Sequence, residues 1–267
     1  MLFGNKNLPN NDELVTLSFK LLKSDKKLLV FAFLSILINA FVIIILFHYE
    51  NRLMSFKMLK AESFFKFMPY FIIYGITATF INTFFNTAII ACLKKNLNNE
   101  KSRLADGFTI AFKRFDKILE WTLFTVTLGA LLRIFRSIQT KWLFDTASDV
   151  VWELISYFIV PIFVYENVGI FKAIKRASDI FGRKWSDEVE GSITFGIYAI
   201  FFLGGCLIIL MFADSLGNQN IFFISLLGIG FSMIMLIIIL SSVNSIFNTV
   251  LYLYAKNDEK ILTLLEY

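Results

Sequence analysis

The sequence predicts an all-α, polytopic membrane protein, and three observations lead to that fold class. The chain of 267 residues is 57% hydrophobic and 17% aromatic, with only 18% charged residues and a mean hydropathy of +0.68, which is outside the range of soluble domains. Uncharged runs of about 20 residues, the length that crosses a hydrocarbon core of roughly 30 Å, recur along the chain. Basic segments with helical periodicity stand between these runs. We therefore expect a helical bundle of six transmembrane spans.

The first apolar run follows a polar stretch, is too long for a signal-peptide core and has no small-x-small cleavage site after it, so we expect it to be retained as a span. The last run is too long for one span, because a helix of that length measures about 52 Å. We expect it to break near Gly228 and Gly230 and to cross the membrane from about Phe231 onward. The six runs cover residues 28–47, 70–93, 118–132, 150–164, 191–213 and 221–255.

The Lys and Arg residues between the runs indicate the orientation. Of the 26, 19 fall on the side that holds both termini, the connection between spans 2 and 3, and the connection between spans 4 and 5. Because short cytoplasmic loops carry the excess of basic residues, both termini are expected to be cytoplasmic. The net charge of +5 then belongs to a cytoplasmic rim that faces anionic lipid headgroups, and a nucleic-acid partner is not expected.

A motif of the form G-x-x-x-A-x-K-R precedes the third and fifth runs, starting at Gly107 and at Gly169. A weaker version, with Ser18 and Lys20 at the Ala and first Lys positions, precedes the first run. Apolar residues recur at helical spacing while basic residues lie off that stripe, which predicts amphipathic helices in the membrane surface. Their basic side chains are expected to contact lipid headgroups, or alternatively an acidic soluble partner: Lys113, Arg114, Lys117, Lys172, Lys175 and Arg176.

A polar pattern is repeated inside two of the apolar runs. NTFFNT begins at Asn82 and NSIFNT begins at Asn244, and an equivalent lysine follows each run. In the stretch ELISYFIVPIFVYEN, Glu153 and Tyr157 take the two Asn positions. We therefore expect one membrane domain over residues 1–267, built from three repeated units of an amphipathic surface helix plus a transmembrane hairpin. The units cover residues 11–95, 102–166 and 167–256, and a tail covers 257–267.

Residues four apart share a helix face, so the repeated pattern predicts polar faces that turn into the bundle. Hydrogen bonds between helices would make these faces a packing device, whereas a cavity between them would make them a polar path for a headgroup. Glu120 follows Lys117 by three residues and is expected to pair with it near the interface. The predicted polar interior consists of Asn82, Asn86, Asn244, Asn248, Tyr157 and Glu153.

The residues that usually support catalysis or metal binding do not form a recognisable set. The sole histidine, His48, ends the first run, and Cys92 and Cys206 share no motif with it or with each other. The chain contains no G-x-S-x-G, no H-E-x-x-H and no phosphate-binding glycine loop. We expect no catalytic, cofactor-binding or metal-binding residues, and no enzyme activity.

Three segments carry a resemblance to a known family: KILEWTLFTVTLGALLR, SYFIVPIFVYENVGIFKAIKRASDIFGRKW and NTVLYLYAKN. They are similar to a bacterial family of six-span membrane proteins of unknown function, and resemble YciC-type proteins and the membrane domain attached to some glycerophosphodiester phosphodiesterases. Ser186 departs from the glycine that family members tend to have after the tryptophan. The resemblance implies a membrane module in a bacterial cytoplasmic membrane. It implies no phosphodiesterase activity, because that activity belongs to a separate soluble barrel.

These expectations lead to two functional hypotheses. The first is a non-catalytic integral membrane protein, a scaffold or accessory subunit that engages membrane lipids and a protein partner. The second is a transporter or lipid-handling protein whose polar path is lined by the Asn faces of spans 2 and 6. A cavity that reaches those Asn residues would distinguish the second hypothesis from the first.

Overall fold

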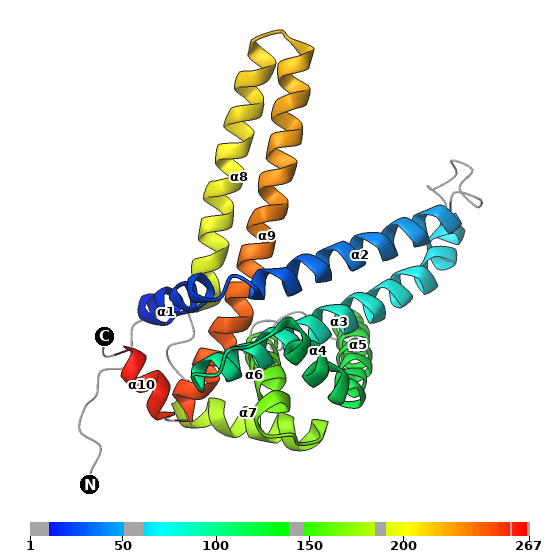
Figure 1. Cartoon of the computed structure of the whole chain (residues 1–267). Coiled ribbons are helices and arrows are strands. Elements are labelled where there is room, and N and C mark those ends of the chain that lie inside the picture. The colour runs from blue at the N-terminus through cyan, green and yellow to red at the C-terminus, as the bar shows by residue number, and fades with distance from the viewer. Residues whose placement is uncertain (1–10, 51–60, 139–146, 185–190, 257, 266–267) are drawn as a thin grey trace. The chain divides into compact units, whose positions relative to one another are not determined.

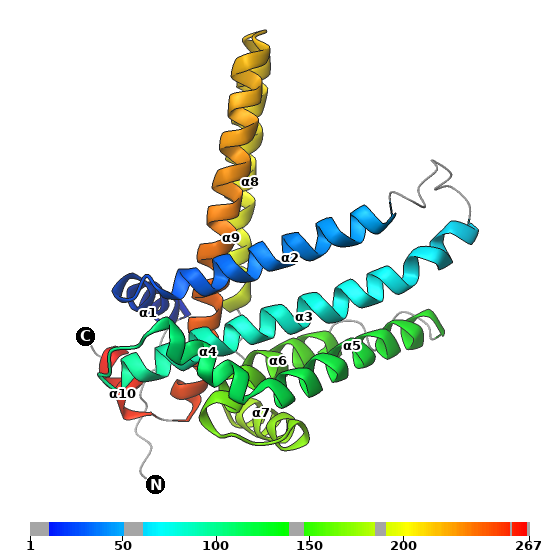
Figure 2. The same cartoon turned by 45° about the vertical axis from the view of Figure 1, so that its right-hand side comes forward.

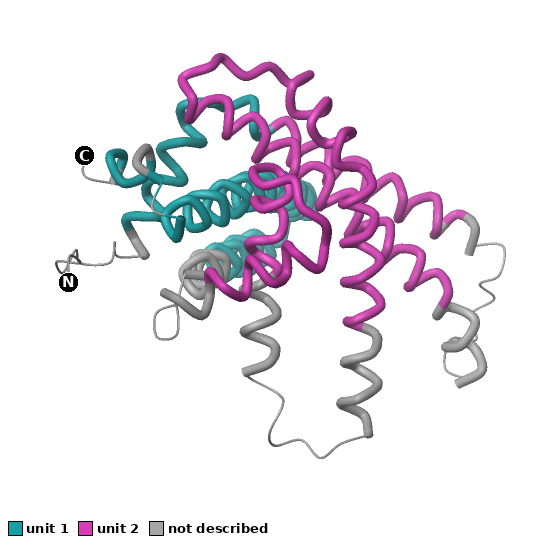
Figure 3. Tube along the Cα trace, turned by 90° about the horizontal axis from the view of Figure 1, so that it is seen from below, with its two compact units in different colours: residues 1–29, 182–267 teal, residues 30–181 magenta. Residues whose placement is uncertain are grey.

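A computed structural model describes residues 11–50, 61–138, 147–184, 191–256 and 258–265 of the chain. Every regular element in these ranges is a helix (Figure 1), which confirms the predicted all-α class. The chain divides into two compact units (Figure 3). The terminal unit combines Met1–Leu29 with Gly182–Tyr267, and the central unit is Val30–Phe181.

The central unit is built around one long helix, α3, against which α4, α5 and α6 pack. Ile90 and Ala91 of α3 form a buried apolar cluster with Val164 of α6, and Ile110 of α4 packs against it. Ring contacts extend this core, since Phe80 of α3 lies 5.2 Å from Phe115 of α5, measured between ring centroids. The helices are α2 (Leu28–Glu50), α3 (Ala61–Leu97), α4 (Leu104–Lys113), α5 (Phe115–Ile138), α6 (Ala147–Tyr165) and α7 (Ile170–Lys184).

The terminal unit contains an antiparallel hairpin of α8 and α9, which run side by side (Figures 1 and 2). The short helices α1 and α10 pack against α9 and against each other. Leu14 of α1, Tyr252 of α9 and Ile261 of α10 are each 0% exposed, and they mark the core of this unit. Its helices are α1 (Asn11–Ser24), α8 (Gly191–Ser215), α9 (Gln219–Ala255) and α10 (Glu259–Leu265).

Helix α9 is continuous over 37 residues, so the predicted break near Gly228 and Gly230 is wrong. A glycine inside a helix costs only about 1 kcal/mol relative to alanine. A break in an apolar environment would leave several backbone groups without hydrogen bonds, at several kcal/mol each. The continuous helix measures about 55 Å, which exceeds a hydrocarbon core of about 30 Å. If α9 crosses a membrane, part of it extends beyond that core or the helix is tilted within it.

Three segments of the described chain are long and apolar enough to cross a membrane: Leu28–Leu46, Pro69–Leu97 and Gln219–Ala255. A fourth is added if the bent pair Ser156–Tyr165 and Ile170–Ile180, which meet at 116°, counts as one. Large apolar side chains cover the outer surfaces of α2, α8 and α9 and are largely exposed, as expected for helices that face lipid rather than water. The predicted runs at 118–132 and 191–213 fall partly outside the residues whose side chains are described.

Helix α4 lies against the C-terminal half of α3, and Gly107 permits this close approach. A Cβ atom at Gly107 would stand 2.6 Å from Cζ of Phe31 and 2.9 Å from the carbonyl oxygen of Ala88. Ala111, one turn later, is 0% exposed. The Gly and Ala of the sequence motif are therefore the small residues of a helix-packing face in this copy, and the packing places the basic end of α4 beside α3.

Candidate functional site

Four basic side chains approach the turn that joins α6 to α7. We define the basic corner as Lys94 of α3, Arg114 between α4 and α5, Lys117 of α5 and Arg176 of α7. All four interact with residues 164–167, at the end of α6 and in the turn that follows it. These contacts bring together residues that are as far apart as 82 positions in the sequence, Lys94 and Arg176.

The turn itself is set by Asn167, whose φ of 52° lies in the left-handed region. Asparagine tolerates this conformation better than most residues and commonly follows a helix end. A similar turn ends α3, where Asn99 has φ 60° and the N–H of Glu100 donates to the carbonyl oxygen of Lys95 at 3.0 Å. These two turns direct the chain from α6 into α7 and from α3 into α4.

Two of the four basic residues pack onto the end of α6. The ammonium group of Lys94 donates to the carbonyl oxygen of Val164 at 3.3 Å and lies 4.6 Å from the centre of the Tyr165 ring. Arg176 Nε pairs with the carboxylate of Glu166 at 3.1 Å, and the Glu166 side chain is only 14% exposed. These contacts fix the turn between α6 and α7.

The other two basic residues share one neutral acceptor. The side chains of Arg114 and Lys117 both donate to Oδ1 of Asn167. The amide oxygen carries no net charge, so it satisfies hydrogen bonds without cancelling either positive charge. Arg114 Nε is buried and makes no hydrogen bond. Neither Arg114 nor Lys117 makes an ion pair within the described residues, so an anion would compensate their positive charges.

The electrostatics of Lys117 reflect this arrangement. Burial lowers the pKa of the Lys117 ammonium below its usual range, and the neighbouring charge of Arg114 lowers it further. The carboxylates of Asp116 and Glu120 act in the opposite direction and do not restore the ordinary value. Glu120 therefore acts on Lys117 through its charge, but the predicted ion pair between the two side chains does not form within the described residues. A bound phosphate would favour the charged lysine.

The helices that flank the corner expose basic and aromatic side chains together. Phe112 at the end of α4 is 64% exposed and Phe171 at the start of α7 is 77% exposed. Lys113, Lys172 and Lys175 are exposed beside them. Aromatic rings next to lysines suit the boundary between hydrocarbon and headgroups, where rings enter the apolar layer and ammonium groups reach the phosphates.

The residues of the predicted polar faces differ from one another in burial and in hydrogen bonding. Asn82 is exposed, but its Oδ1 accepts a hydrogen bond from Oγ of Ser35 at 2.8 Å and one from Nδ2 of Asn39 at 3.2 Å. These bonds join α2 to α3. Asn86 and Asn248 are half-buried, Asn244 is exposed, and Oδ1 of Asn248 is buried without a hydrogen bond.

Hydroxyl residues, which the predicted polar interior does not include, occupy buried positions in both repeats. Thr87 donates to the carbonyl oxygen of Thr83 at 2.8 Å, and Thr249 donates to that of Ser245 at 2.9 Å. All four are buried. The signal was present in the repeated pattern, because a hydroxyl residue follows each Asn. Of the other predicted interior residues, Tyr157 is half-buried and the side chain of Glu153 lies outside the described residues.

The fold and the corner together define an all-helical protein whose long apolar helices suit a membrane and whose basic residues gather at a helix turn. Within the described residues, no three His, Cys, Asp or Glu side chains gather in a way that could hold a metal ion. The chain belongs to DUF6159, a family of unknown function whose model matches residues 64–261. That range contains the whole basic corner. No curated protein and no solved structure matches the chain.

Proposed function

We propose that the protein is a non-catalytic integral membrane module that binds anionic lipid headgroups at its basic corner. In this role it would act as a scaffold or accessory subunit in a bacterial cytoplasmic membrane and engage a protein partner. The observation that carries the proposal is the shared acceptor of Arg114 and Lys117, the amide oxygen of Asn167. A phosphate group would offer these two cations several charged acceptor oxygens in place of one neutral oxygen.

The geometry of the flanking helices supports the same proposal. The exposed rings of Phe112 and Phe171 and the exposed Lys113, Lys172 and Lys175 suit helices α4 and α7 to the membrane surface. The corner then lies at headgroup level. With the basic connections on the cytoplasmic side, both termini are cytoplasmic and the corner faces the leaflet that is rich in anionic lipid.

The proposed architecture has six spans in three repeated units, and three features of the described residues support it. Residues 81–92 and 243–254 have the same order of buried, half-buried and exposed positions throughout. The Ala position of the surface-helix motif, occupied by Ser18, Ala111 and Ala173, is 0% exposed in each copy. In addition, α1 packs on α9 as α4 packs on α3. The likeness to YciC-type proteins and to the membrane domain of some glycerophosphodiester phosphodiesterases belongs to this proposal.

The contacts of Asn82 favour a packing role over a transport path at this position. Ser35 and Asn39 of α2 donate to its side-chain oxygen, and such bonds specify how two spans meet. A polar path would instead need acceptors that face open space. The scaffold function is therefore preferred to the transporter function.

The proposal is tested by extracting the protein with its surrounding membrane into polymer-bounded native lipid discs and identifying the retained proteins and lipids by mass spectrometry. The proposal predicts enrichment of anionic lipid over the bulk membrane and a protein partner at fixed stoichiometry. Lipid of bulk composition would contradict headgroup binding. An absence of any stoichiometric partner would contradict the accessory-subunit role but not headgroup binding.

A further inference from the structure

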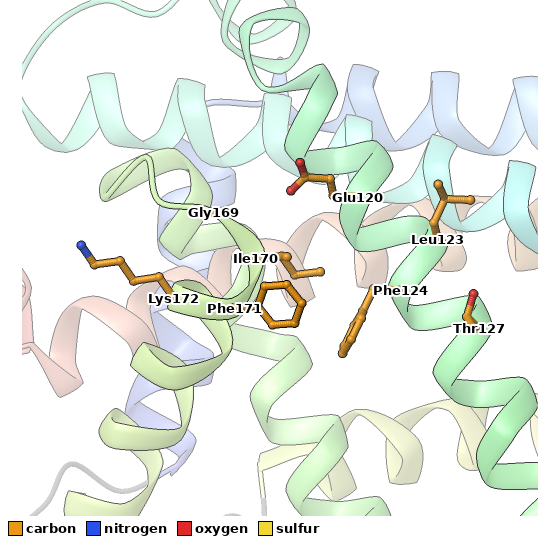
Figure 4. Close-up of a pocket in the computed structure, with 8 residues that line it drawn as sticks. All are labelled: Glu120, Leu123, Phe124, Thr127, Gly169, Ile170, Phe171 and Lys172. Carbon is orange, nitrogen blue, oxygen red and sulfur yellow. The ribbon is translucent and has the colours of Figure 1, made fainter.

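An open groove of about 640 Å³ lies between α5 and the start of α7, within the central unit (Figure 4). Its volume falls in the range of roughly 300–1,000 Å³ that is typical of small-molecule sites. The groove lies one helical turn beyond Lys117, since Glu120 is its first lining residue on α5. The lining residues are Glu120, Leu123, Phe124, Thr127, Gly169, Ile170, Phe171 and Lys172.

Most of the groove wall is apolar. Phe124 of α5 and Phe171 of α7 meet edge to face with ring centroids 6.3 Å apart, and this contact joins the two walls. Leu123 is 47% exposed and Phe171 is 77% exposed. A surface of this kind at the end of a membrane helix suits a hydrocarbon chain better than water.

The two charged lining residues have opposite signs and stand on different walls. Glu120 belongs to α5 and Lys172 to α7 (Figure 4). Neither makes a hydrogen bond or an ion pair within the described part of the chain, although the charge of Glu120 acts on Lys117. A ligand that complements these walls carries one positive group, one negative group and an apolar chain.

The sign of Glu120 separates two classes of lipid. A headgroup with only negative charge would place its phosphate in the field of this carboxylate, which is unfavourable in a partly desolvated groove. A zwitterionic headgroup with a primary ammonium offers N–H donors to Glu120 and phosphate oxygens to Lys172. A quaternary ammonium has no N–H donor and cannot make the first of these hydrogen bonds.

We propose that this groove binds one aminophospholipid of the phosphatidylethanolamine type. Its ammonium pairs with Glu120, and one acyl chain lies against Leu123, Phe124 and Ile170. Its phosphate contacts Lys172 after that side chain, which points away from Glu120 in Figure 4, turns toward the groove. This inference rests on the proposed function, because it needs α7 at the membrane surface and α5 entering the hydrocarbon. The groove site is distinct from the basic corner, which binds the anionic lipid.

The test uses the full-length protein in discs that contain equal amounts of phosphatidylethanolamine, phosphatidylcholine and phosphatidylglycerol. Native mass spectrometry after mild delipidation identifies the lipid that is retained. The wild type should retain phosphatidylethanolamine several-fold over phosphatidylcholine. Glu120→Gln, which keeps the shape of the side chain but removes its charge, should abolish that preference. Asp179→Asn, at an exposed carboxylate of α7 outside the groove, is the matched control and should keep it.

Leu123→Trp fills the groove and should remove the retained phosphatidylethanolamine while leaving phosphatidylglycerol binding intact. Retention of phosphatidylcholine as strongly as phosphatidylethanolamine, or an unchanged preference in Glu120→Gln, would overturn the assignment. A dimer that Leu123→Trp dissociates would also overturn the assignment, because it would show that a second copy of the chain occupies the groove.

The two proposals fail separately. If the basic corner is not a headgroup site, phosphatidylglycerol enrichment is absent in the wild type while the phosphatidylethanolamine preference persists. If only the groove assignment fails, phosphatidylglycerol enrichment is present and Glu120→Gln changes nothing.

Discussion

Replacing Gly107 by alanine should destabilise the protein, because the structure leaves no room for one added methyl group. The new Cβ would meet Cζ of Phe31 at 2.6 Å and the backbone oxygen of Ala88 at 2.9 Å. Overpacking of this kind typically costs about 1–3 kcal/mol, and a fixed backbone oxygen argues for the upper end, about 3 kcal/mol. Alanine regains about 1 kcal/mol of helix propensity over glycine. The expected net loss is therefore about 2 kcal/mol.

The assay is thermal unfolding of the purified protein in detergent, followed by the loss of monodisperse protein with temperature. For a chain of this size, about 2 kcal/mol corresponds to a decrease in Tm of about 4–8 °C. Gly75→Ala is the matched control, since a Cβ at this helical glycine of α3 meets nothing within 4 Å. It should leave Tm unchanged or raise it slightly. A Gly107→Ala variant as stable as Gly75→Ala would refute the close packing of α4 on α3.

Three further predictions concern polar and charged groups. Asn82→Leu removes two hydrogen bonds to α2, worth about 0.6 kcal/mol each in a membrane, and should lower Tm by about 2–5 °C. Asn244→Leu, which removes no hydrogen bond within the described residues, should leave Tm unchanged, and an equal decrease in both variants would contradict a role in packing. The pKa of Asp106 is lowered, mainly by the hydrogen bond from the backbone N–H of Arg103 and also by Lys95. The Asp106 carboxylate therefore stabilises the folded protein above about pH 4, and this stabilisation is lost as pH falls through the lowered pKa. Asp106→Asn should therefore melt earlier than the wild type at pH 7 and equally at strongly acidic pH, and a difference that persists there would exclude the carboxylate as its cause. The pKa of Lys117 is lowered, so the affinity for phosphatidylglycerol should fall as pH rises, below the pH of about 10.4 at which ordinary lysines titrate. Lys117→Arg should retain its affinity over the same pH range. Identical pH profiles for the two proteins would contradict a role for this ammonium.

The helical class and the apolar segments could be predicted because they depend on composition and on the length of uncharged runs. Hydropathy is summed over about 20 residues, so single errors have little effect. The uninterrupted course of α9 could not be predicted in this way. Gly228 and Gly230 have low helix propensity in water, but backbone hydrogen bonds dominate in an apolar environment, and the helix continues through both.

The candidate site was only partly predictable for a different reason. The basic residues of α4 and α7 could be identified by periodicity, but nothing in the sequence placed Arg114 and Lys117 on Asn167, which is 50 or more positions away. That contact depends on the turn after α6 and on the packing of α4 against α3. Likewise, a helical repeat tells which residues share a face, but it does not tell which neighbour covers that face. The exposure of Asn82 and the burial of Thr83 therefore do not follow from the repeat alone.

The most direct test of the central claim measures anionic lipid at the basic corner. Wild-type protein and two charge-matched variants, Arg114→Gln/Lys117→Gln and Lys20→Gln/Lys23→Gln, are placed in discs with equal phosphatidylglycerol and phosphatidylcholine. Lys20 and Lys23 are exposed on α1, so the second variant removes the same charge elsewhere. Loss of one charge-assisted hydrogen bond costs about 1.5 kcal/mol, which corresponds to about a tenfold loss of binding. Arg114→Gln/Lys117→Gln should therefore lose at least about tenfold of the phosphatidylglycerol enrichment. Lys20→Gln/Lys23→Gln should retain it. Equal losses in both variants, or no loss in either, would contradict a headgroup site at this corner.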